Sequence, residues 1–126
     1  MRNLRCTNPA EPLGARPGPR PASVTPRLAR RLGGQVRMVG KLGRDDFGQR
    51  FLRAMEKEGI NTKYVFFDPS AHTGVGSPVI DAQGDNSIII VPGANLGLTP
   101  DDIDQARDAI TSADLLMLQL EISVDT

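Results

Sequence analysis

The sequence predicts an α/β protein whose sheet carries a small inserted β-structure. Three observations support this class. Short runs of apolar and β-branched residues alternate with segments of helical periodicity, two such runs are joined by a turn, and the resulting order is strand, helix, strand, hairpin, helix, strand. Strands that alternate with helices favour a parallel sheet, whereas neighbouring runs joined by a short turn favour an antiparallel pair. A chain of 126 residues predicts a single domain.

Charge is distributed unevenly along the chain. Residues 1–31 hold seven arginines and one acidic residue, Glu11, while the remainder holds eight basic and fourteen acidic residues, so the two parts carry about +6 and −6. Cys6 is the only cysteine, which excludes an intrachain disulfide and fits a reducing compartment. No apolar run reaches the ~18 residues of a membrane-spanning helix, and the start lacks the apolar core of a secretory signal. A cytoplasmic protein is expected.

Proline dominates the first segment, at Pro12, Pro17, Pro19, Pro21 and Pro26. Because proline lacks the N–H and fixes φ, this density opposes helix interiors and central strands. Residues 1–31 are therefore expected to be a Pro/Arg-rich start that is disordered or aberrant, with disorder over most of 1–26. An arginine-rich nucleic-acid arm or a targeting segment is disfavoured, since the segment has no lysine, one serine and helix-breaking prolines. Neither nucleic acid nor a membrane is an expected partner.

The regular pattern starts at Leu32. The stretch QVRMVGKLG (35–43) predicts a short strand, and YVFFD (64–68) predicts a second. Between them, DDFGQRFLRAMEKEG (45–59) predicts a helix, because Asp45 can cap its first N–H groups, apolar residues recur at helical spacing and Gly59 can end it.

Two further runs, 73–81 and 86–95, predict a hairpin around the turn residues Gly84 and Asp85. Pro78 lies inside the first run, which predicts an edge strand or a bulge there, because proline cannot donate to the ladder.

The segment LTPDDIDQARDAI predicts another helix, capped by Thr99 in a Thr-x-x-Asp capping box with proline at the first helical position. LLMLQLE (115–121) then predicts a strand over 115–120, apolar at first and polar at its end. Strand carboxyl ends open into the ligand crevice of α/β sheets, so Glu121 is a candidate ligand-binding residue.

Two phosphate-binding motifs fail on inspection. Gly43 and Gly48 have the spacing of a P-loop, but Gln49 and Arg50 stand where that motif needs Lys and Ser/Thr. The dinucleotide fingerprint G-x-G-x-x-G is also absent from the sequence, which disfavours a Rossmann oxidoreductase. These glycines are interpreted as a tight turn that lets the backbone enter the helix.

No metal or triad site is expected from the single histidine. His72 lies in a Ser-Ala-His-Thr-Gly context typical of a turn, and neither a second histidine nor a second cysteine exists. The acids around 101–108 are interpreted as helix-start residues, because carboxylates stabilise the positive end of the helix dipole.

Residues 32–126 resemble consecutive segments of the ribokinase-like (PfkB) carbohydrate kinases. The resemblance rests on LGGQVRMVGKLGRDDFGQRFLRAMEKEGINT, TGVGSPVIDAQGDNSIIIVPGAN and LTPDDIDQARDAITSADLLMLQLEI. Four short motifs stand in the family's order and spacing: Gly43-x-Asp45-x-x-Gly48, Thr73-Gly74-Val75, Gly93-Ala94-Asn95 and Leu118-Gln119-Leu120-Glu121. The last two are most similar to the ribokinase branch.

The resemblance implies a partial Rossmann-like ribokinase fold with an inserted β-sheet lid, at about 64–93. It also implies ATP-dependent, Mg²⁺-assisted phosphoryl transfer to a hydroxyl of a pentose such as ribose or a related sugar, with a possible homodimer through the lid. Carried over by position, Gly76, Pro78 and Ile90 are expected to face the sugar, and Glu121 to accept its hydrogen bonds. Gly76 and Pro78 stand where the family has larger aliphatic residues.

Two departures from the family pattern accompany the resemblance. The strand with a sugar-binding Asp and the Gly-Gly-x-x-x-Asn segment are expected before residue 32, where the Pro/Arg-rich residues lie instead, which suits an altered reading frame or a mis-assigned start. The Gly-Ala-Gly-Asp segment, with the catalytic base, anion hole and nucleotide site, is expected after Glu121. The chain is therefore interpreted as an incomplete kinase without its own catalytic, ATP-binding or metal-binding residues. Alternatives are a fructokinase-like or nucleoside kinase-like member, or a non-catalytic, dimerising lid module.

Overall fold

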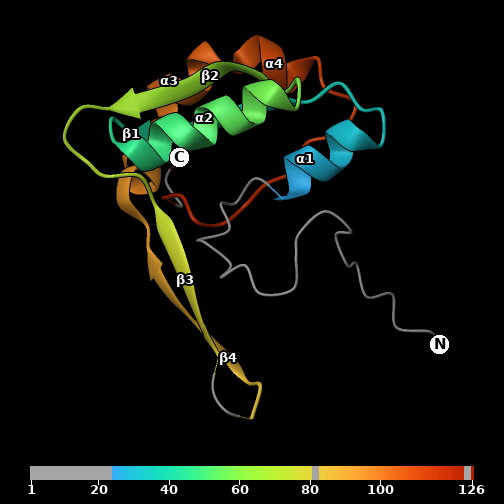
Figure 1. The fold of residues 1–126 in the computed structure, drawn as a ribbon. Coiled ribbons are helices and arrows are strands. Elements are labelled where there is room, and N and C mark those ends of the chain that lie inside the picture. Colours follow the sequence, from blue (N-terminus) through green and yellow to red (C-terminus); the bar gives the residue numbers. More distant parts are fainter. Residues whose placement is uncertain (1–23, 81–82, 124–125) are drawn as a thin grey trace.

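A computed structural model of the chain describes residues 24–80, 83–123 and 126. The first predicted strand is β1, Arg37–Gly43, the predicted helix is α2, Asp46–Lys57, and the second strand is β2, Asn61–Asp68. β1 and β2 pair in parallel, with α2 as the connection between them (Figure 1). The predicted βαβ order is confirmed. Gly59 ends α2 in the left-handed region, at a φ of 72°, which a glycine adopts without a Cβ penalty.

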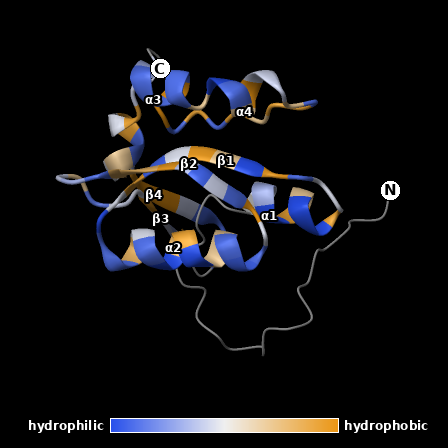
Figure 2. Cartoon of the chain, turned by 90° about the horizontal axis from the view of Figure 1, so that it is seen from above, coloured by the Kyte–Doolittle hydropathy of each residue, from blue (hydrophilic) through white to orange (hydrophobic). Residues whose placement is uncertain are grey.

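Helices cover both faces of this parallel pair. α3, Pro100–Gln105, and α4, Arg107–Thr111, lie along one face, and α2 lies along the other (Figure 2). Successive side chains of a strand point to opposite faces, so β1 contacts both layers. Leu42 and the fully buried Met55 line a small pocket beside β1 and α2. On the opposite face, the Lys41 side chain reaches α3.

The predicted helix after Thr99 forms as two shorter helices. Thr99 caps α3 in the predicted capping box, since its Oγ1 accepts from the Asp102 N–H while the Asp102 carboxylate accepts from the Thr99 N–H. At Ala106 the backbone turns to φ −90° and ψ 4°, which separates α3 from α4. Ala106 and Ala109 are buried, so the two short helices still present one apolar face.

The predicted hairpin forms a ribbon that projects away from the α/β layers (Figure 1). β3, Val75–Ile80, pairs antiparallel with β4, Asn86–Val91, and Gly84 in the connecting turn has a φ of 90°. Pro78 lies in an edge strand of this two-stranded sheet, as predicted. The second run ends earlier than 95, because Pro92 and the left-handed Gly93 lead into a short 3-10 helix, η1, Gly93–Gly97.

The expected range of the inserted sheet, about 64–93, overlaps the parallel sheet at its start. β2 includes residues 64–68 and pairs with β1, so only β3 and β4 form the separate ribbon.

The prediction of disorder over most of 1–26 meets the described residues only at 24–26, and these three lie in a helix. α1, Val24–Arg31, is a helix with Pro26 at its third position (Figure 1). Proline is tolerated in a first turn, because the first N–H groups of a helix have no intrahelical partner. Residues 1–23, on which the rest of that prediction falls, lie outside the described residues.

The prediction of a strand over 115–120 is also wrong. These residues are irregular and exposed, and Leu120 retains 92% of its accessible surface. A strand needs a neighbour to pair its backbone groups, and the parallel sheet among the described residues consists of β1 and β2 alone. An apolar run without a pairing partner cannot form a ladder.

Within the described part of the chain, no helix has the length and apolar character needed to cross a membrane.

Candidate functional site

One face of the β3–β4 ribbon gathers three of the four residues expected to bind sugar. Gly76 pairs with Ile90 across the ribbon, and Pro78 pairs with Ile88. Paired residues, and residues two apart in a strand, share a face, so these four form one surface, named here the ribbon face. Pro78, Ile88 and Ile90 are exposed, and Gly76 is half-buried. Ile88 was not selected from the sequence, although its spacing from Ile90 could have identified it.

Glu121, the fourth expected residue, lies apart from any strand. It is exposed in the irregular segment after α4, and it makes no hydrogen bond or ion pair with the described residues. The interpretation of Glu121 as a strand-end carboxylate is therefore wrong in its structural basis. Its assignment as a sugar ligand stays a prediction, because no contact in the structure tests it.

The base of the ribbon is fixed to the start of α2 by Asp45 and Thr73. The Gly48 N–H donates to Asp45 Oδ1 at 2.8 Å, so Asp45 caps the helix as predicted. The Thr73 N–H donates to Asp45 Oδ2 at 2.8 Å, and the Thr73 hydroxyl donates to Oδ1 at 2.7 Å. Thr73 Oγ1 also accepts from the Gly43 N–H at the carboxyl end of β1, at 3.0 Å. Asp45 and Thr73 together therefore join the end of β1, the start of α2 and the base of the ribbon.

These bonds determine the charge state of Asp45. Donation from the Gly48 N–H, followed by donation from the Thr73 N–H and hydroxyl, lowers the pKa of Asp45 to about 2. His72 Nδ1 lies 3.6 Å from Asp45 Oδ2, but the imidazole is 94% exposed, which agrees with the predicted turn histidine.

Three glycines allow the close approach of backbones at the ribbon base. A Cβ on Gly48 would lie 2.3 Å from the Gly43 carbonyl oxygen, and one on Gly43 would lie 2.5 Å from the Ala71 oxygen. Gly93 has a φ of 52°, and a Cβ there would lie 2.3 Å from the His72 oxygen. Any side chain would separate the segments, so the glycines hold the ribbon against the carboxyl end of β1.

The same contacts argue against a phosphate loop between Gly43 and Gly48. A phosphate cradle needs backbone N–H groups that point at the ligand. Here the Gly43 N–H is bonded to Thr73 and the Gly48 N–H to Asp45. The described residues also contain no cluster of three or more His, Cys, Asp or Glu that could hold a metal ion. The N–H groups of both glycines are therefore unavailable to a phosphate.

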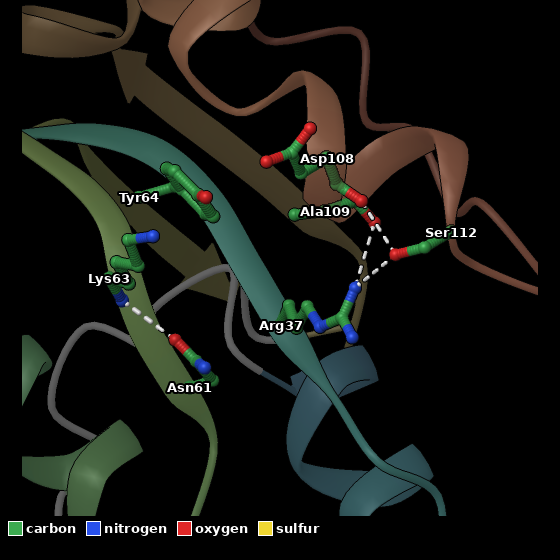
Figure 3. A pocket seen from close by; sticks show the side chains of 7 residues that line it. All are labelled: Arg37, Asn61, Lys63, Tyr64, Asp108, Ala109 and Ser112. Atoms are coloured by element: carbon green, nitrogen blue, oxygen red, sulfur yellow. Dashed lines mark hydrogen bonds between the residues drawn. The ribbon is translucent and has the colours of Figure 1, made fainter.

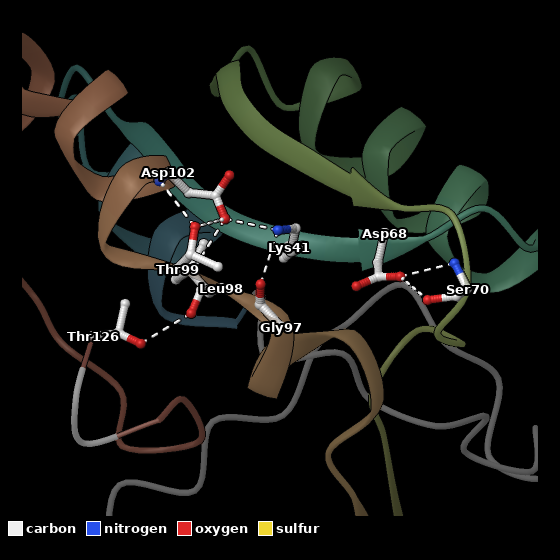
Figure 4. Close-up of polar contacts among 8 residues, drawn as sticks. All are labelled: Lys41, Asp68, Ser70, Gly97, Leu98, Thr99, Asp102 and Thr126. Atoms are coloured by element: carbon white, nitrogen blue, oxygen red, sulfur yellow. Dashed lines mark hydrogen bonds and ion pairs between the residues drawn. The ribbon is translucent and has the colours of Figure 1, made fainter.

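A buried ion pair braces the region beside the ribbon base (Figure 4). Lys41 Nζ lies 2.7 Å from Asp102 Oδ2 and donates to the Gly97 carbonyl at 2.8 Å. Burial disfavours the charged form of Asp102, but the hydrogen bonds from Lys41 and Thr99 outweigh it and lower the pKa. Asp68, at the end of β2, has its pKa lowered by donation from the Ser70 and Ala71 N–H groups.

Comparison with known proteins places this arrangement in a family. Residues 25–125 match the family described as pfkB family carbohydrate kinase. Deoxyribokinase of Salmonella typhi is 40% identical over 98 residues, covering 78% of this chain and 32% of that protein. Ribokinase of Bacillus subtilis (strain 168) is 40% identical over 99 residues, covering 78% of this chain and 33% of that protein. The chain spans about a third of the length of the curated relatives it matches.

A solved structure supports the same assignment at the level of fold. Ribokinase from Giardia lamblia superposes with a TM-score of 0.66 at 28% identity, over 79% of this chain and 32% of that one. The βαβ unit with its attached ribbon is therefore part of the α/β ribokinase fold. The chain belongs to the pfkB family of carbohydrate kinases.

Proposed function

We propose that this chain supplies part of the sugar-binding half of an ATP-dependent kinase of the ribokinase type. The observation that supports this most is the ribbon face, on which Gly76, Pro78 and Ile90 lie together above a rigidly fixed base. The family is one of carbohydrate kinases, and its members similar to this chain include a ribokinase and a deoxyribokinase. We therefore expect the substrate to be a pentose, either ribose or 2-deoxyribose.

The chemistry of the ribbon face suits a lid better than a catalytic surface. Its side chains are apolar, so they contribute shape and water exclusion, and they carry no group that could transfer a proton. Phosphoryl transfer depends on positioned charges around the phosphates, and the ribbon face carries no charged side chain. The lid role therefore fits the residues that this chain provides.

A chimera tests the proposed substrate class. Residues 25–125 replace the matching segment of the Bacillus subtilis enzyme, and ADP formation is measured with ATP, Mg²⁺ and ribose, 2-deoxyribose, fructose or a nucleoside. The proposal expects turnover with a pentose above the other sugars. A folded chimera that prefers fructose or a nucleoside would support the fructokinase-like or nucleoside kinase-like alternative.

We propose that the chain by itself phosphorylates no sugar, because the resemblance assigns the family's catalytic base and nucleotide site to none of its residues. Purified protein is incubated with ATP, Mg²⁺ and ribose, and released ADP is compared with a mock preparation. Sugar-dependent ADP release above that background would overturn this part of the proposal.

A non-catalytic, dimerising lid module is the second candidate. It is favoured by the exposed isoleucines on both faces of β4, because apolar strands without a cover tend to pair with another chain. A chimera that is inactive with every sugar, while the chain forms a stable dimer, would favour this second candidate.

A further inference from the structure

A cavity of about 280 Å³ lies at the end of the parallel sheet opposite to the ribbon base (Figure 3). It is bounded by side chains from β1, β2 and α4 with its following turn: Arg37, Asn61, Lys63, Tyr64, Asp108 and Ser112. Arg37 pairs with Asn61 at the amino ends of both strands, whereas the ribbon leaves from their carboxyl ends. The cavity is therefore separate from the proposed sugar site.

A shift in the register between β1 and β2 shapes the sheet side of this cavity. From Arg37 to Val39, β1 advances two residues, while its partner β2 advances three, from Asn61 to Tyr64. The extra residue is a bulge, which breaks the strict alternation of side chains. Two consecutive residues, Lys63 and Tyr64, can thus line one cavity, and Lys63 Nζ lies 4.8 Å from the centre of the Tyr64 ring.

Arg37 is held in place from the helical side of the cavity. Its Nη1 donates to Ser112 Oγ at 2.6 Å and to the Ala109 carbonyl at 3.4 Å (Figure 3). Among the described residues both bonds start from Nη1, so Nε and Nη2 remain as donors for a ligand. A guanidinium fixed by two bonds loses little entropy on binding, and its planar donors match the oxygens of a phosphate.

The remaining groups are suited to the organic part of such a ligand. Asp108 supplies carboxylate oxygens that accept hydrogen bonds from hydroxyl groups, and Tyr64 supplies an aromatic ring against which a sugar can pack. The two cations exceed the single carboxylate, so the cavity favours an anion. Its volume fits a small molecule and not a nucleotide chain.

We propose that this cavity binds a small phosphorylated sugar, with Arg37 and Lys63 on the phosphate and Asp108 on a sugar hydroxyl. Arg37 and Lys63 could bind free phosphate in the same way. The contribution of the sugar to binding must therefore be tested separately. The inference does not depend on the kinase activity proposed above.

Phosphorus NMR of the ligand tests the proposal with the whole chain. Ribose 5-phosphate and inorganic phosphate are each titrated against the protein, and saturable line broadening gives the two affinities. We expect saturable binding of ribose 5-phosphate in the millimolar range, and a loss of about tenfold for Arg37→Gln, since charged hydrogen bonds carry the phosphate. Arg53→Gln, which removes an exposed charge on α2, should change the affinity less than about twofold.

Two further variants separate the sources of the signal. Lys63→Gln should also lower the affinity of the protein for both ligands, because both carry the phosphate. Circular dichroism shows whether each variant retains its fold. Asp108→Ala should weaken the binding of ribose 5-phosphate relative to that of inorganic phosphate, because it removes the acceptor for the sugar hydroxyl, while the loss of the repulsive charge favours both anions alike. Equal losses for Arg37→Gln and Arg53→Gln, or no saturable binding of either anion, would overturn the proposal. Equal affinity of both anions in every variant would overturn the sugar contact.

Discussion

Asp45 shows how one side chain serves two parts of the molecule. It is the N-cap of α2, and it also receives the N–H and the hydroxyl of Thr73, which lies 28 positions later in the chain. Only an ionised carboxylate accepts all three of these bonds at full strength. The low pKa of Asp45 is a consequence of this arrangement, and it links the stability of the ribbon base to pH.

Replacing Asp45 by Asn should lower the free energy of unfolding by about 1 kcal/mol at neutral pH, in the range measured for lost caps. The folded pKa of Asp45 is lowered from 3.8 to about 2, so its stabilisation is complete above 3.8 and is lost as the pH falls towards 2. Denaturant melts at several pH values should therefore show the difference between the two proteins shrinking over that range. Asp46→Asn, which changes the neighbouring exposed carboxylate, is the control. An equal loss of unfolding free energy in Asp46→Asn would contradict the role assigned to Asp45.

Glu121→Ala should weaken sugar binding in the chimera by about 1.5–3 kcal/mol, the range for hydrogen bonds to charged groups. ATP binding without sugar should barely change, because the resemblance assigns Glu121 to the sugar. Calorimetry with ribose measures the first quantity and calorimetry with ATP the second. Glu56→Ala on α2 is the control, and an unchanged sugar affinity for Glu121→Ala would leave Glu121 as a solvated carboxylate.

At the scale of elements, α1 is joined to α2 through a single carboxylate. Glu58 at the end of α2 accepts from Arg31 Nη2 at 2.6 Å and from Arg27 Nη2 at 3.1 Å. Arg30 adds a bond from its Nε to the Gly59 carbonyl at 3.2 Å. Hydrogen bonding by Arg31 is the main cause that lowers the pKa of Glu58 to about 2, although partial burial opposes it. Three of the seven arginines of residues 1–31 thus hold α1 against the end of α2.

Glu58→Gln should release α1 from α2. Amide hydrogen exchange in 27–31 should become faster, while exchange in α2 should change little, because α2 keeps its packing on the sheet. In the parent protein the protection factors of the amides in 27–31, which correct for the slower intrinsic exchange at low pH, should fall as the pH falls from 4.5 towards 2. The lowered folded pKa of Glu58 means that its contact with the arginines is lost on protonation. Glu56→Gln is the control. Exchange in 27–31 that is as slow in Glu58→Gln as in the parent would show that the ion pairs are dispensable.

At the scale of the whole molecule, much apolar surface remains uncovered among the described residues. Leu115, Leu118 and Leu120 are 76%, 71% and 92% exposed in the irregular segment after α4. Ile88, Ile89 and Ile90 of β4 are each exposed by more than half. Contiguous apolar patches of this kind mark surfaces that contact another protein or another segment.

The purified chain should therefore self-associate. Light scattering coupled to gel filtration should give a mass of at least a dimer, and a dye for exposed apolar surface should bind. Replacing Leu118 and Leu120 by Gln should reduce dye binding, whereas Ile89→Ser should reduce association through the ribbon. A monomer that melts in one sharp transition would contradict the expectation, because such a protein has no large apolar surface to cover.

Local sequence signals were sufficient to predict most of the helix caps and turns. The caps at Asp45 and Thr99, the left-handed glycines at 59 and 84, and the proline in an edge strand all act through residues within about four positions. Such signals are readable without a partner. The family resemblance selected Gly76, Pro78 and Ile90 by position, and the strand register brings them together on the ribbon face.

The contacts between segments far apart in the chain could not be predicted in this way. The Thr73–Asp45 bonds and the Arg31–Glu58 pair each join residues more than 25 positions apart, and no periodicity encodes them. The segment 115–120 shows the opposite case, since its apolar pattern fits a strand but the described residues offer it no neighbour. A helix forms its backbone hydrogen bonds within its own segment, whereas a strand requires a second strand to pair with. Local sequence therefore predicts a helix better than it predicts a strand.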